Sequence, residues 1–589
     1  MECYKKNYPR PQFVRESWES LDGIWAFAFD DADCGEREKW YNAFPEGRQI
    51  RVPFTYEARL SGSGDESHHS VVWYRRSLRV DGGQLAAKRC MLHFEGSDYE
   101  TKLWVNGQYA GSHRGGYARF SFDITNLVNA GENTLTVRVE DHCDLQQTRG
   151  KQRWTKENIS VFYVQNTGIW KTVWLEYVPA IRLEQVKMTP DIQTGSLRLT
   201  AEVIAPEARL NGELLLETVV TFRGSPVNST LTALTEHRRQ LVLDLHAAIS
   251  NTEEFGVRLW SPEDPALYDI TFRILEHDRM VDEVGSYFAM REIRIEGDRI
   301  LLNEKPLYQR LVLDQGYWKD SLLTPPDEEA LVKDIDSVLA LGYNGVRKHQ
   351  KVEDERFLYW CDVKGLLVWG EMAAAFLFTD QALTDFSREW TEVVRQNYNH
   401  PCIITWTPFN ESWGVLQIRR DPAQQSFTQA VYHLTKSIDP TRPVITNDGW
   451  EHTVSDIITL HDYTQDAQSL KQRVGEHCAE VLSDRASLYA ARPAFAQGFA
   501  YRGQPVIVSE YGGLAIIQDD PAYGFGCKVA AEEFAGRFEA LAAALKELPG
   551  LCGYCYTQLT DVQQEINGLM DMERNFKADP AFIRAVNTR

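Results

Sequence analysis

Two glutamates each come directly after a strongly apolar run of the chain. Glu411, with its neighbour Asn410, follows residues 403–409, and Glu510 follows residues 506–509. A carboxylate at the end of a buried strand is held rigidly where the dielectric constant is low. Cleavage of a glycosidic bond needs such a pair. One carboxylic acid protonates the leaving oxygen, and one carboxylate attacks the anomeric carbon or stabilises the cationic transition state.

Repulsion between two facing carboxylates would divide these roles between them. It raises the pKa of one group and leaves the other group ionised. The spacing alone leaves a structural alternative open, in which each glutamate forms an ion pair with an arginine at the mouth of the fold. The elements that carry Glu411 and Glu510 decide whether the two side chains meet.

Eight short apolar runs after residue 291 are the elements that must position these side chains. They alternate with amphipathic helical stretches, which is the pattern of βα units. We therefore predict a (β/α)8 TIM barrel over residues 292–589. The rival, a doubly wound open sheet, is disfavoured because no glycine-rich phosphate loop follows any strand. The predicted strands cover residues 307–313, 344–347, 366–369, 403–409, 444–446, 457–460, 506–509 and 553–557.

Capping signals mark the first barrel helix. Thr324 is the expected N-cap, Pro325 suits the first helical position, and Gly342 ends the helix. Between the sixth and seventh strands, residues 464–504 form a long connection. Its composition predicts helices that shield the barrel, and a functional lid is the alternative.

Polar residues recur at the ends of the predicted strands, where TIM barrels carry their chemistry. Asn447, Asp448 and Tyr511 occupy such ends without an assigned role. The candidate site residues at these ends are Asp314, Arg347, His349, Glu371, Asn410, Glu411, His461, Tyr463, Glu510, Gln558 and Asp561.

The first 291 residues are predicted to form two β-sandwiches. Short alternating runs, with the hairpin signal Asn106-Gly107 between two of them, indicate a sandwich over residues 1–180. Residues 181–291 hold about seven further short strands, which suggests an immunoglobulin-like sandwich.

Composition excludes several function classes. The 589 residues include 63 Lys and Arg against 84 Asp and Glu, a net charge of −21. Such a surface repels nucleic-acid phosphates and anionic lipid heads, so we expect no nucleic-acid or membrane partner. The first residues lack the apolar core of a signal peptide, and no run approaches 18 apolar residues, so we expect a cytoplasmic protein. Ten cysteines are scattered along the chain, and Cys552 and Cys555 are expected to be plain thiols.

Several motifs resemble those of glycoside hydrolase family 2, and the resemblance spans nearly the whole chain. The segment from Asn397-Tyr398-Asn399-His400-Pro401 to Asn410-Glu411-Ser412-Trp413-Gly414 is similar to that family's acid/base signature. Ser509-Glu510-Tyr511-Gly512-Gly513 resembles its nucleophile motif. Gly168-Ile169-Trp170 and the residues to Glu176 resemble the end of its N-terminal jelly-roll domain, and Asn303-Glu304-Lys305-Pro306 resembles its entry into the barrel.

This resemblance implies a retaining exo-glycosidase that works by double displacement. By position, Glu411 matches the acid/base and Glu510 the nucleophile. Asn410 matches the residue that binds the sugar 2-hydroxyl, and Tyr463 the tyrosine that steadies the nucleophile. Arg347, His349, Asp314 and Glu371 lie where the family contacts its substrate, and Trp413 is a candidate for stacking on the sugar.

Departures from the family pattern bear on the substrate. Family glucuronidases carry Asn-any-Lys after the last strand, but this chain has Glu565-Ile566-Asn567 there, and Asn575-Phe576-Lys577 falls ten residues later. Some family galactosidases bind magnesium shortly after strand 3, but Glu371 is followed by apolar residues, so we expect no metal or cofactor. Lys348-His349-Gln350-Lys351 replaces a Ser-His-Tyr-Pro loop, which leaves the sugar contacts there open.

A neutral β-linked sugar, with β-galactoside first, is therefore the predicted substrate. β-Glucuronide, β-galacturonide, β-mannoside and α-L-arabinoside remain open, as does transglycosylation. A catalytically silent carbohydrate-binding protein is the alternative of another class, disfavoured because both carboxylates are present. A homo-oligomer is expected by analogy with the family alone.

Overall fold

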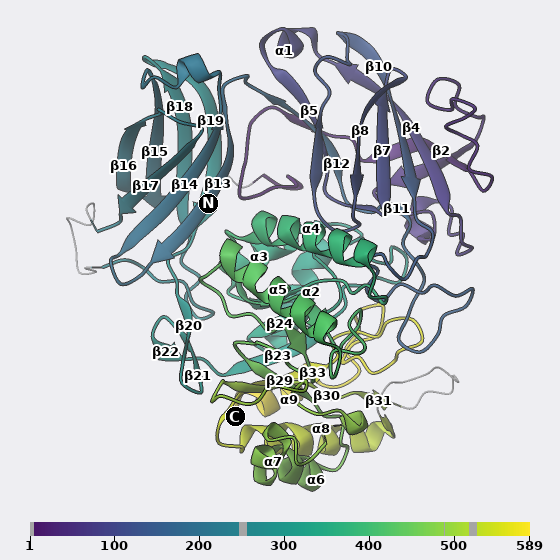
Figure 1. Cartoon of the computed structure of the whole chain (residues 1–589), viewed down its shortest axis with the longest axis vertical. Helices are drawn as coiled ribbons and strands as arrows, with labels where there is room; N and C mark the ends of the chain where they lie inside the picture. The colour runs from purple at the N-terminus through teal and green to yellow at the C-terminus, as the bar shows by residue number, and fades with distance from the viewer. Residues whose placement is uncertain (1–4, 247–255, 488, 517–526) are drawn as a thin grey trace.

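The computed structural model describes residues 5–246, 256–487, 489–516 and 527–589. Figure 1 shows two β-sandwiches side by side above a barrel that ends the chain. This confirms the predicted fold class of jelly roll, immunoglobulin-like sandwich and TIM barrel. Among the described residues, no helix is long and apolar enough to cross a lipid bilayer.

The N-terminal domain is a jelly-roll sandwich of two main antiparallel sheets with strand orders β1-β12-β5-β9 and β3-β2-β4-β10-β7-β8. Their inner faces pack aromatic and aliphatic side chains such as Trp25, Tyr74 and Leu103 into one core. Asn106 and Gly107 join β7 to β8 at positive φ, as the hairpin signal predicts. The elements are β1 (Trp18–Ser20), β2 (Gly23–Phe29), β3 (Arg48–Val52), β4 (Val71–Val80), α1 (Gly82–Ala87), β5 (Arg89–Phe94), β6 (Ser97–Asp98), β7 (Glu100–Val105), β8 (Gln108–Arg114), β9 (Phe120–Asp123), β10 (Gly131–Glu140), β11 (Gly168–Ile169) and β12 (Val173–Val178).

The second domain packs a three-stranded sheet, β13-β14-β17, against a four-stranded sheet, β16-β15-β18-β19. Alternate residues of β15 and β18 are buried, which is the period-2 pattern of a sheet with one face in a core. The strands are β13 (Arg182–Asp191), β14 (Ser196–Ile204), β15 (Leu214–Phe222), β16 (Ser225–Ala233), β17 (Arg238–Asp244), β18 (Tyr268–Glu276) and β19 (Arg279–Phe288).

A small meander of β20 (Ile293–Glu296), β21 (Arg299–Leu302) and β22 (Lys305–Pro306) leads into the barrel. Seven barrel strands form one parallel sheet in the order β26-β25-β24-β23-β33-β30-β29. They are β23 (Gln309–Asp314), β24 (Gly345–Lys348), β25 (Leu367–Glu371), β26 (Ile403–Thr407), β29 (Ile458–His461), β30 (Val506–Gly512) and β33 (Leu551–Thr557).

The fifth barrel strand differs from its prediction over residues 444–446. Val444 forms only a parallel bridge to Trp406, and the strand itself is the short β28 (Asn447–Asp448), which pairs with β27 (Phe409–Asn410). The regular ladder therefore lies three residues later than expected, directly beside Asn410.

The outer helices are α2 (Glu328–Ala340), α3 (Glu355–Lys364), α4 (Asp380–Asn397), α5 (Pro422–Ile438), α6 (Ala467–Lys471), α7 (Cys478–Leu482), α8 (Ala531–Lys546) and α9 (Pro580–Thr588), while β31 (Leu514–Ile516) pairs with β32 (Cys527–Val529). The expected cap of the first helix is wrong. The Asp327 side chain accepts from the Ala330 amide, whereas the Thr324 hydroxyl donates to the Trp170 carbonyl of the jelly roll. Thr324 therefore joins two domains instead of capping a helix.

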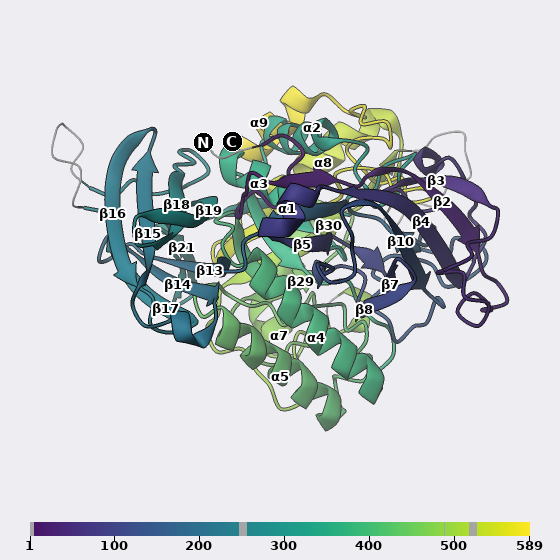
Figure 2. The ribbon, with the colours of Figure 1, turned by 90° about the horizontal axis from the view of Figure 1, so that it is seen from above.

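Residues 142–167 leave the jelly roll and lie against the carboxyl end of the barrel; we call this segment the crossing segment. The amides of Arg149 and Gly150 both donate to the Ala374 carbonyl, at 2.9 and 3.0 Å. The Asn158 side chain donates through Nδ2 to the side-chain oxygens of Gln563 and Gln564 at 2.6 and 2.9 Å. Figure 2, seen from above, shows the jelly roll lying over one side of the barrel. One wall of the barrel mouth therefore comes from the first domain.

Residues 464–504, predicted to hold shielding helices, contain α6 and α7. Leu470 and Val474 from this segment are buried in the main core of the barrel domain. The Tyr489 ring lies 5.6 Å from that of Tyr463. The segment therefore covers the barrel side and reaches the mouth at Tyr489.

Candidate active site

Arg347, at the end of β24, is the centre of the polar cluster in the barrel mouth. Its guanidinium donates to Glu371 through Nε at 2.7 Å and to Asn410 Oδ1 through Nη2 at 2.6 Å. Through Nη1 it pairs with Asp448 at 2.6 Å and Glu510 at 2.9 Å. The planar fork of arginine suits several acceptors at once. It therefore fixes side chains from four different strands relative to one another.

Glu510 lies in β30 and is held on both oxygens. Arg347 contacts Oε1, and the Tyr463 hydroxyl donates to Oε2 at 2.5 Å. Burial, followed by the charge of Glu510, raises the pKa of Tyr463 well above its usual range. Tyr463 therefore remains a neutral donor at neutral pH.

Glu411 follows β27 and faces the same space. One of its oxygens lies 2.8 Å from His461 Nδ1, while His461 Nε2 lies 2.7 Å from Asp448. One ligand atom each of Glu411, His461 and Glu510 lies within 4.8 Å of the other two. The two predicted carboxylates therefore do meet, across His461.

The electrostatics of this trio follow from its burial. Burial alone lowers the pKa of His461, but the charges of Glu510 and Asp448 and its hydrogen bonds outweigh burial and raise it to about 10. Burial raises the pKa of Glu411, but the hydrogen bond and charge of His461 outweigh that effect and hold it below its ordinary value. The Glu411–His461 pair therefore keeps one shared proton through the neutral range.

The backbone at Glu411 is strained. Glu411 has φ 51° and Ser412 has φ 61°, the left-handed region that non-glycine residues rarely adopt. The Glu411 amide donates to the Asp448 carbonyl at 2.9 Å and the Ser412 amide to Asn447 at 2.9 Å. Such strain persists only where neighbouring contacts enforce it, and it clusters at functional sites.

Two further predicted residues join the cluster. Asn410 is buried, and its Nδ2 has no hydrogen-bond partner among the described residues, which leaves a donor available for a ligand. His349 Nδ1 lies 2.9 Å from Glu371 and 3.1 Å from Arg347. Burial, then the charges of Lys151 and Arg347, lowers the pKa of His349 well below its usual range, so its ring is neutral.

Three predicted residues lie outside the cluster. Asp314 forms a buried ion pair with Lys348 at 2.6 Å. Asp561 pairs with Lys577 at 2.6 Å, and burial raises the pKa of Asp561 to about 6 despite that charge. Gln558 bonds Gln315 and Asn567 at 2.8 and 2.7 Å. The charges and hydrogen-bonding groups of these three side chains are therefore satisfied by neighbouring residues outside the cluster.

Trp413 belongs to an aromatic group shared by two domains. Its ring lies 5.9 Å from Phe162 of the crossing segment and 5.3 Å from Phe376 of the barrel. Trp154 completes the group at 4.5 Å from Phe162. Trp413 lies two residues after Glu411 in sequence, so this aromatic group provides an apolar surface beside the acid.

Sequence reasoning missed Asp448, Lys151 and the aromatic residues of the crossing segment. Asp448 stood at a predicted strand end, and that position was its only signal. Lys151 precedes the barrel by about 140 residues, and nothing local connects it with Glu411. Only the packing of the crossing segment on the barrel brings it there.

Asp362, His400 and Cys402 form a second group with metal-ligating atoms, buried behind the barrel strands. Asp362 accepts from the Tyr287 hydroxyl at 2.7 Å and the Cys402 amide at 2.8 Å, and His400 Nδ1 lies 2.6 Å away. This carboxylate is thus fully used by hydrogen bonds that join the second domain to the barrel, which fits a structural role.

Comparison with known proteins identifies the family. Residues 18–179 match the sugar binding domain of glycosyl hydrolases family 2, residues 181–291 match its central model, and residues 293–519 match its TIM barrel domain. Beta-galactosidase of Thermoanaerobacter pseudethanolicus is 27% identical over 389 residues, 64% of this chain and 49% of that protein. Beta-glucuronidase of Chlorocebus aethiops is 25% identical over 568 residues, 87% of this chain and 81% of that protein.

A solved structure, the beta-glucuronidase of an uncultured Clostridium species, superposes with a TM-score of 0.78 over 99% of both chains at 20% identity. It supports the fold alone. The chain spans about half the length of the two curated relatives that it matches at 27% identity. Since the three family models follow one another along most of the sequence, in the order of the three observed domains, the chain belongs to glycoside hydrolase family 2.

Proposed function

We propose that the chain is a retaining exo-glycosidase, with Glu510 as nucleophile and Glu411 as general acid/base. The observation that carries this proposal is the approach of the two carboxylates to within 4.8 Å. Retaining enzymes hold their two carboxyl groups about 5–5.5 Å apart, whereas inverting enzymes need about 6.5–9.5 Å to admit a water.

In the first step, Glu510 attacks the anomeric carbon while Glu411 protonates the leaving oxygen. The bond from carbon to the leaving oxygen breaks as a covalent glycosyl-enzyme forms. Arg347 and Tyr463 orient the attacking carboxylate. The Asn410 Nδ2 donor is directed to a sugar hydroxyl.

In the second step, Glu411 is a carboxylate and removes a proton from water. The water oxygen attacks the anomeric carbon, and Glu510 leaves as a carboxylate. His461 suits this exchange, since the proton that Glu411 takes from water can pass to His461 Nδ1, 2.8 Å away, and return to Glu411 for the next first step. The sugar is released with its original anomeric configuration.

For the sugar, we propose a neutral β-linked residue, with β-galactoside first. At the family's uronate-binding position, Glu565 is buried and accepts from Tyr163 and from Asn567. Its negative charge would repel a sugar carboxylate. Lys577 is neutralised by Asp561 and also donates to the Ile566 carbonyl, so this lysine is not available to a uronate.

A β-glucuronide or β-galacturonide is the second candidate, favoured by Lys151. Lys151 has no ion-pair partner among the residues that the structure describes, and its charge acts on both Glu411 and His349. A cation in that place could accept a sugar carboxylate from the jelly-roll side of the mouth. Relatives named beta-glucuronidase agree with this alternative.

The test is a panel of nitrophenyl glycosides of galactose, glucose, mannose, glucuronate, galacturonate, xylose and arabinose. We expect wild type to cleave one class and Glu510→Gln to lose turnover by several orders of magnitude with an unchanged fold. NMR of the first-formed product should show the retained anomer. Full activity of Glu510→Gln, or an inverted product, would overturn the mechanism.

Lys151→Met separates the two sugar classes, with Lys156→Met as the matched control because Lys156 is exposed on the same segment. If the substrate is a uronide, Lys151→Met should raise KM about tenfold or more, since charged hydrogen bonds contribute about 1.5–3 kcal/mol. A neutral substrate predicts little change in KM. Binding of sugars without turnover across the panel would favour a silent carbohydrate-binding protein.

A further inference from the structure

A cavity of about 450 Å³ lies between the immunoglobulin-like domain and the barrel, away from the carboxylate pair. Its wall includes the turn Tyr398–Pro401, which precedes β26, whereas Asn410 and Glu411 follow that strand's other end. Asn399 ties this turn to β13 by accepting from the Met188 amide at 2.8 Å. The cavity therefore opens at the opposite end of the barrel from the active site.

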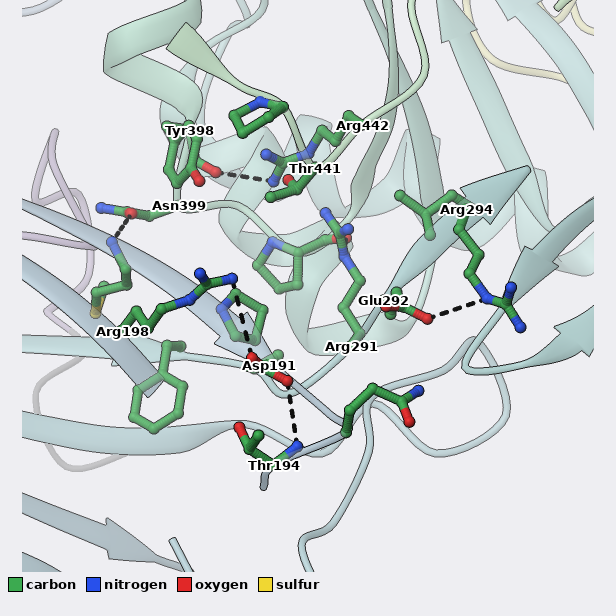
Figure 3. A pocket seen from close by; sticks show the side chains of 18 residues that line it. Asp191, Thr194, Arg198, Arg291, Glu292, Arg294, Tyr398, Asn399, Thr441 and Arg442 are labelled. Atoms are coloured by element: carbon green, nitrogen blue, oxygen red, sulfur yellow. Dashed lines mark hydrogen bonds and ion pairs between the residues drawn. The ribbon is translucent and has the colours of Figure 1, made fainter. Parts of the chain in front are cut away.

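Four arginines and two carboxylates line this cavity, in a chain whose net charge is −21. Figure 3 shows Arg198, Arg291 and Arg442 around the cavity, while the Arg294 guanidinium turns away from these three beside Glu292. Three of the arginines have carboxylate partners: Arg198 with Asp191 at 4.0 Å, Arg294 with Glu292 at 3.3 Å, and Arg442 with Asp439 at 2.6 Å.

Arg291 is the exception. No carboxylate of the described residues lies within 4.0 Å of its guanidinium, which donates only to the carbonyls of Pro401 at 2.9 Å and Ile403 at 2.7 Å. The residue is 5% exposed. Carbonyl oxygens satisfy the N–H groups but do not neutralise the charge, and a buried unpaired charge costs free energy.

The surroundings of Arg291 agree with a positive charge that lacks a contacting carboxylate. Burial, then the nearby charge of Arg442, lowers its pKa to about 9, so it is still protonated at neutral pH. Figure 3 shows the Arg291 side chain extending toward Thr441 and Arg442. The guanidinium therefore borders the cavity as a cation that no carboxylate of the described residues contacts, although the charges of Asp439 and Asp362 act on it from farther away.

We propose that this cavity binds a small organic molecule through an oxyanion, a phosphate or carboxylate group paired with Arg291. Its volume lies in the range of about 300–1,000 Å³ typical of small-molecule sites. Pro190, Phe288, Pro401 and Pro440 give it apolar walls for the organic part of the ligand. Arginine forks bind both oxyanion types in paired hydrogen bonds.

Calorimetry of the whole chain tests the site with inorganic phosphate, glucose 6-phosphate, citrate and glucose as probes. We expect one site that binds the anions but not glucose, with affinity falling as salt rises. A preference between the phosphates and citrate identifies the oxyanion. Glu510→Gln should leave the dissociation constant unchanged, because an anion bound in the active site would instead respond to that substitution.

Two substitutions should change the affinity for the anion in opposite directions. Arg291→Gln should weaken binding about tenfold or more. Asp191→Asn should tighten it severalfold, because it removes a repelling carboxylate and frees Arg198. Arg299→Gln, an exposed arginine on β21, is the control and should change nothing. If Arg291→Gln fails to fold, the anion affinity of Asp191→Asn is the deciding measurement. An unchanged affinity in Asp191→Asn, or no binding of any anion, overturns the proposal.

Discussion

At the scale of single residues, the geometry of the barrel mouth depends on which positively charged side chain pairs with which carboxylate. Glu510 pairs with Arg347, as the structural alternative expected, and yet it also approaches Glu411. The apolar strands before Glu411 and Glu510 made both glutamates predictable from sequence. The bridging role of His461 was not predictable, because it depends on distances between strands 4, 6 and 7.

The first prediction concerns His461→Asn. In wild type, the pKa of His461 is raised to about 10, so the Glu411–His461 pair retains its proton well above neutral pH. Without the imidazolium, Glu411 alone must hold that proton. The alkaline limb of the kcat/KM profile should therefore move down by about one pH unit or more.

His452→Asn is the control for this profile. His452 is also buried, but it bonds Thr459 and does not contact Glu411. Its alkaline limb should match that of wild type. An unshifted limb in His461→Asn would show that the shared proton has no role in turnover.

The second prediction concerns Tyr463→Phe, which removes the hydroxyl that donates to Glu510. Hydrogen bonds to charged groups contribute about 1.5–3 kcal/mol, so kcat/KM should fall about 10- to 100-fold. The matched control is Tyr511→Phe. The Tyr511 hydroxyl is buried without a hydrogen-bond partner in the described chain, so its loss should leave the rate nearly unchanged. Equal rates for both variants would contradict the role of Tyr463.

At the scale of elements, regular strands and helices were more predictable than their connections. β4 (Val71–Val80) is one of the short runs that indicated the first sandwich, because its first four residues are apolar and buried and Leu78 and Val80 continue the buried face at alternate positions. The fifth barrel strand and the start of α2 differed by a few residues, since side chains of other domains and strands compete for the local caps and pairs. The crossing segment gave no sequence signal because its packing partners lie more than 200 residues away.

The third prediction tests the crossing segment through Gly150→Ala. A Cβ at Gly150 would lie 2.3 Å from the Gln350 carbonyl, and the residue has φ +59°. Gly297 has φ +60° with nothing within 4 Å, so Gly297→Ala carries the same backbone strain without the clash. We expect Gly150→Ala to push the segment off the barrel and lower kcat/KM about tenfold or more. Gly297→Ala should keep wild-type kinetics, and equal kinetics in the two variants would exclude the segment from the site.

At the scale of the whole molecule, the three domains and their order were predictable from the sequence. The sequence did not predict that a segment of the jelly roll would form part of the active-site wall. The jelly roll and the barrel meet through buried polar contacts. For example, the Thr148 hydroxyl and the Tyr117 backbone amide both donate to the Glu389 carboxylate. Since these partners are separated by more than 240 residues, no local pattern reports them.

The fourth prediction concerns stability of the folded chain against pH. Burial in the jelly roll raises the pKa of Glu57 to about 8, above its unfolded value of about 4.5. Its contribution is therefore fully present below pH 4.5 and is lost as pH rises through 8. Glu57→Gln should remove this loss, and its advantage in free energy of unfolding should grow to about 3 kcal/mol by pH 7.

Guanidinium unfolding at pH 4.5, 6 and 7 measures this difference. Glu132→Gln, an exposed carboxylate on β10, is the control and should show no growing advantage. A constant difference between Glu57→Gln and wild type across these pH values would mean that Glu57 is ionised in the folded chain.

The charge count around Arg347 has a consequence for inhibition. One guanidinium and one imidazolium face four carboxylates, those of Glu371, Glu411, Asp448 and Glu510. This negative surplus favours the positive charge that develops on the sugar ring. A sugar-shaped amine, protonated where the anomeric carbon would sit, should therefore compete far better than its uncharged ether counterpart. The advantage of the amine should fade once the pH of the assay exceeds the pKa of its own nitrogen.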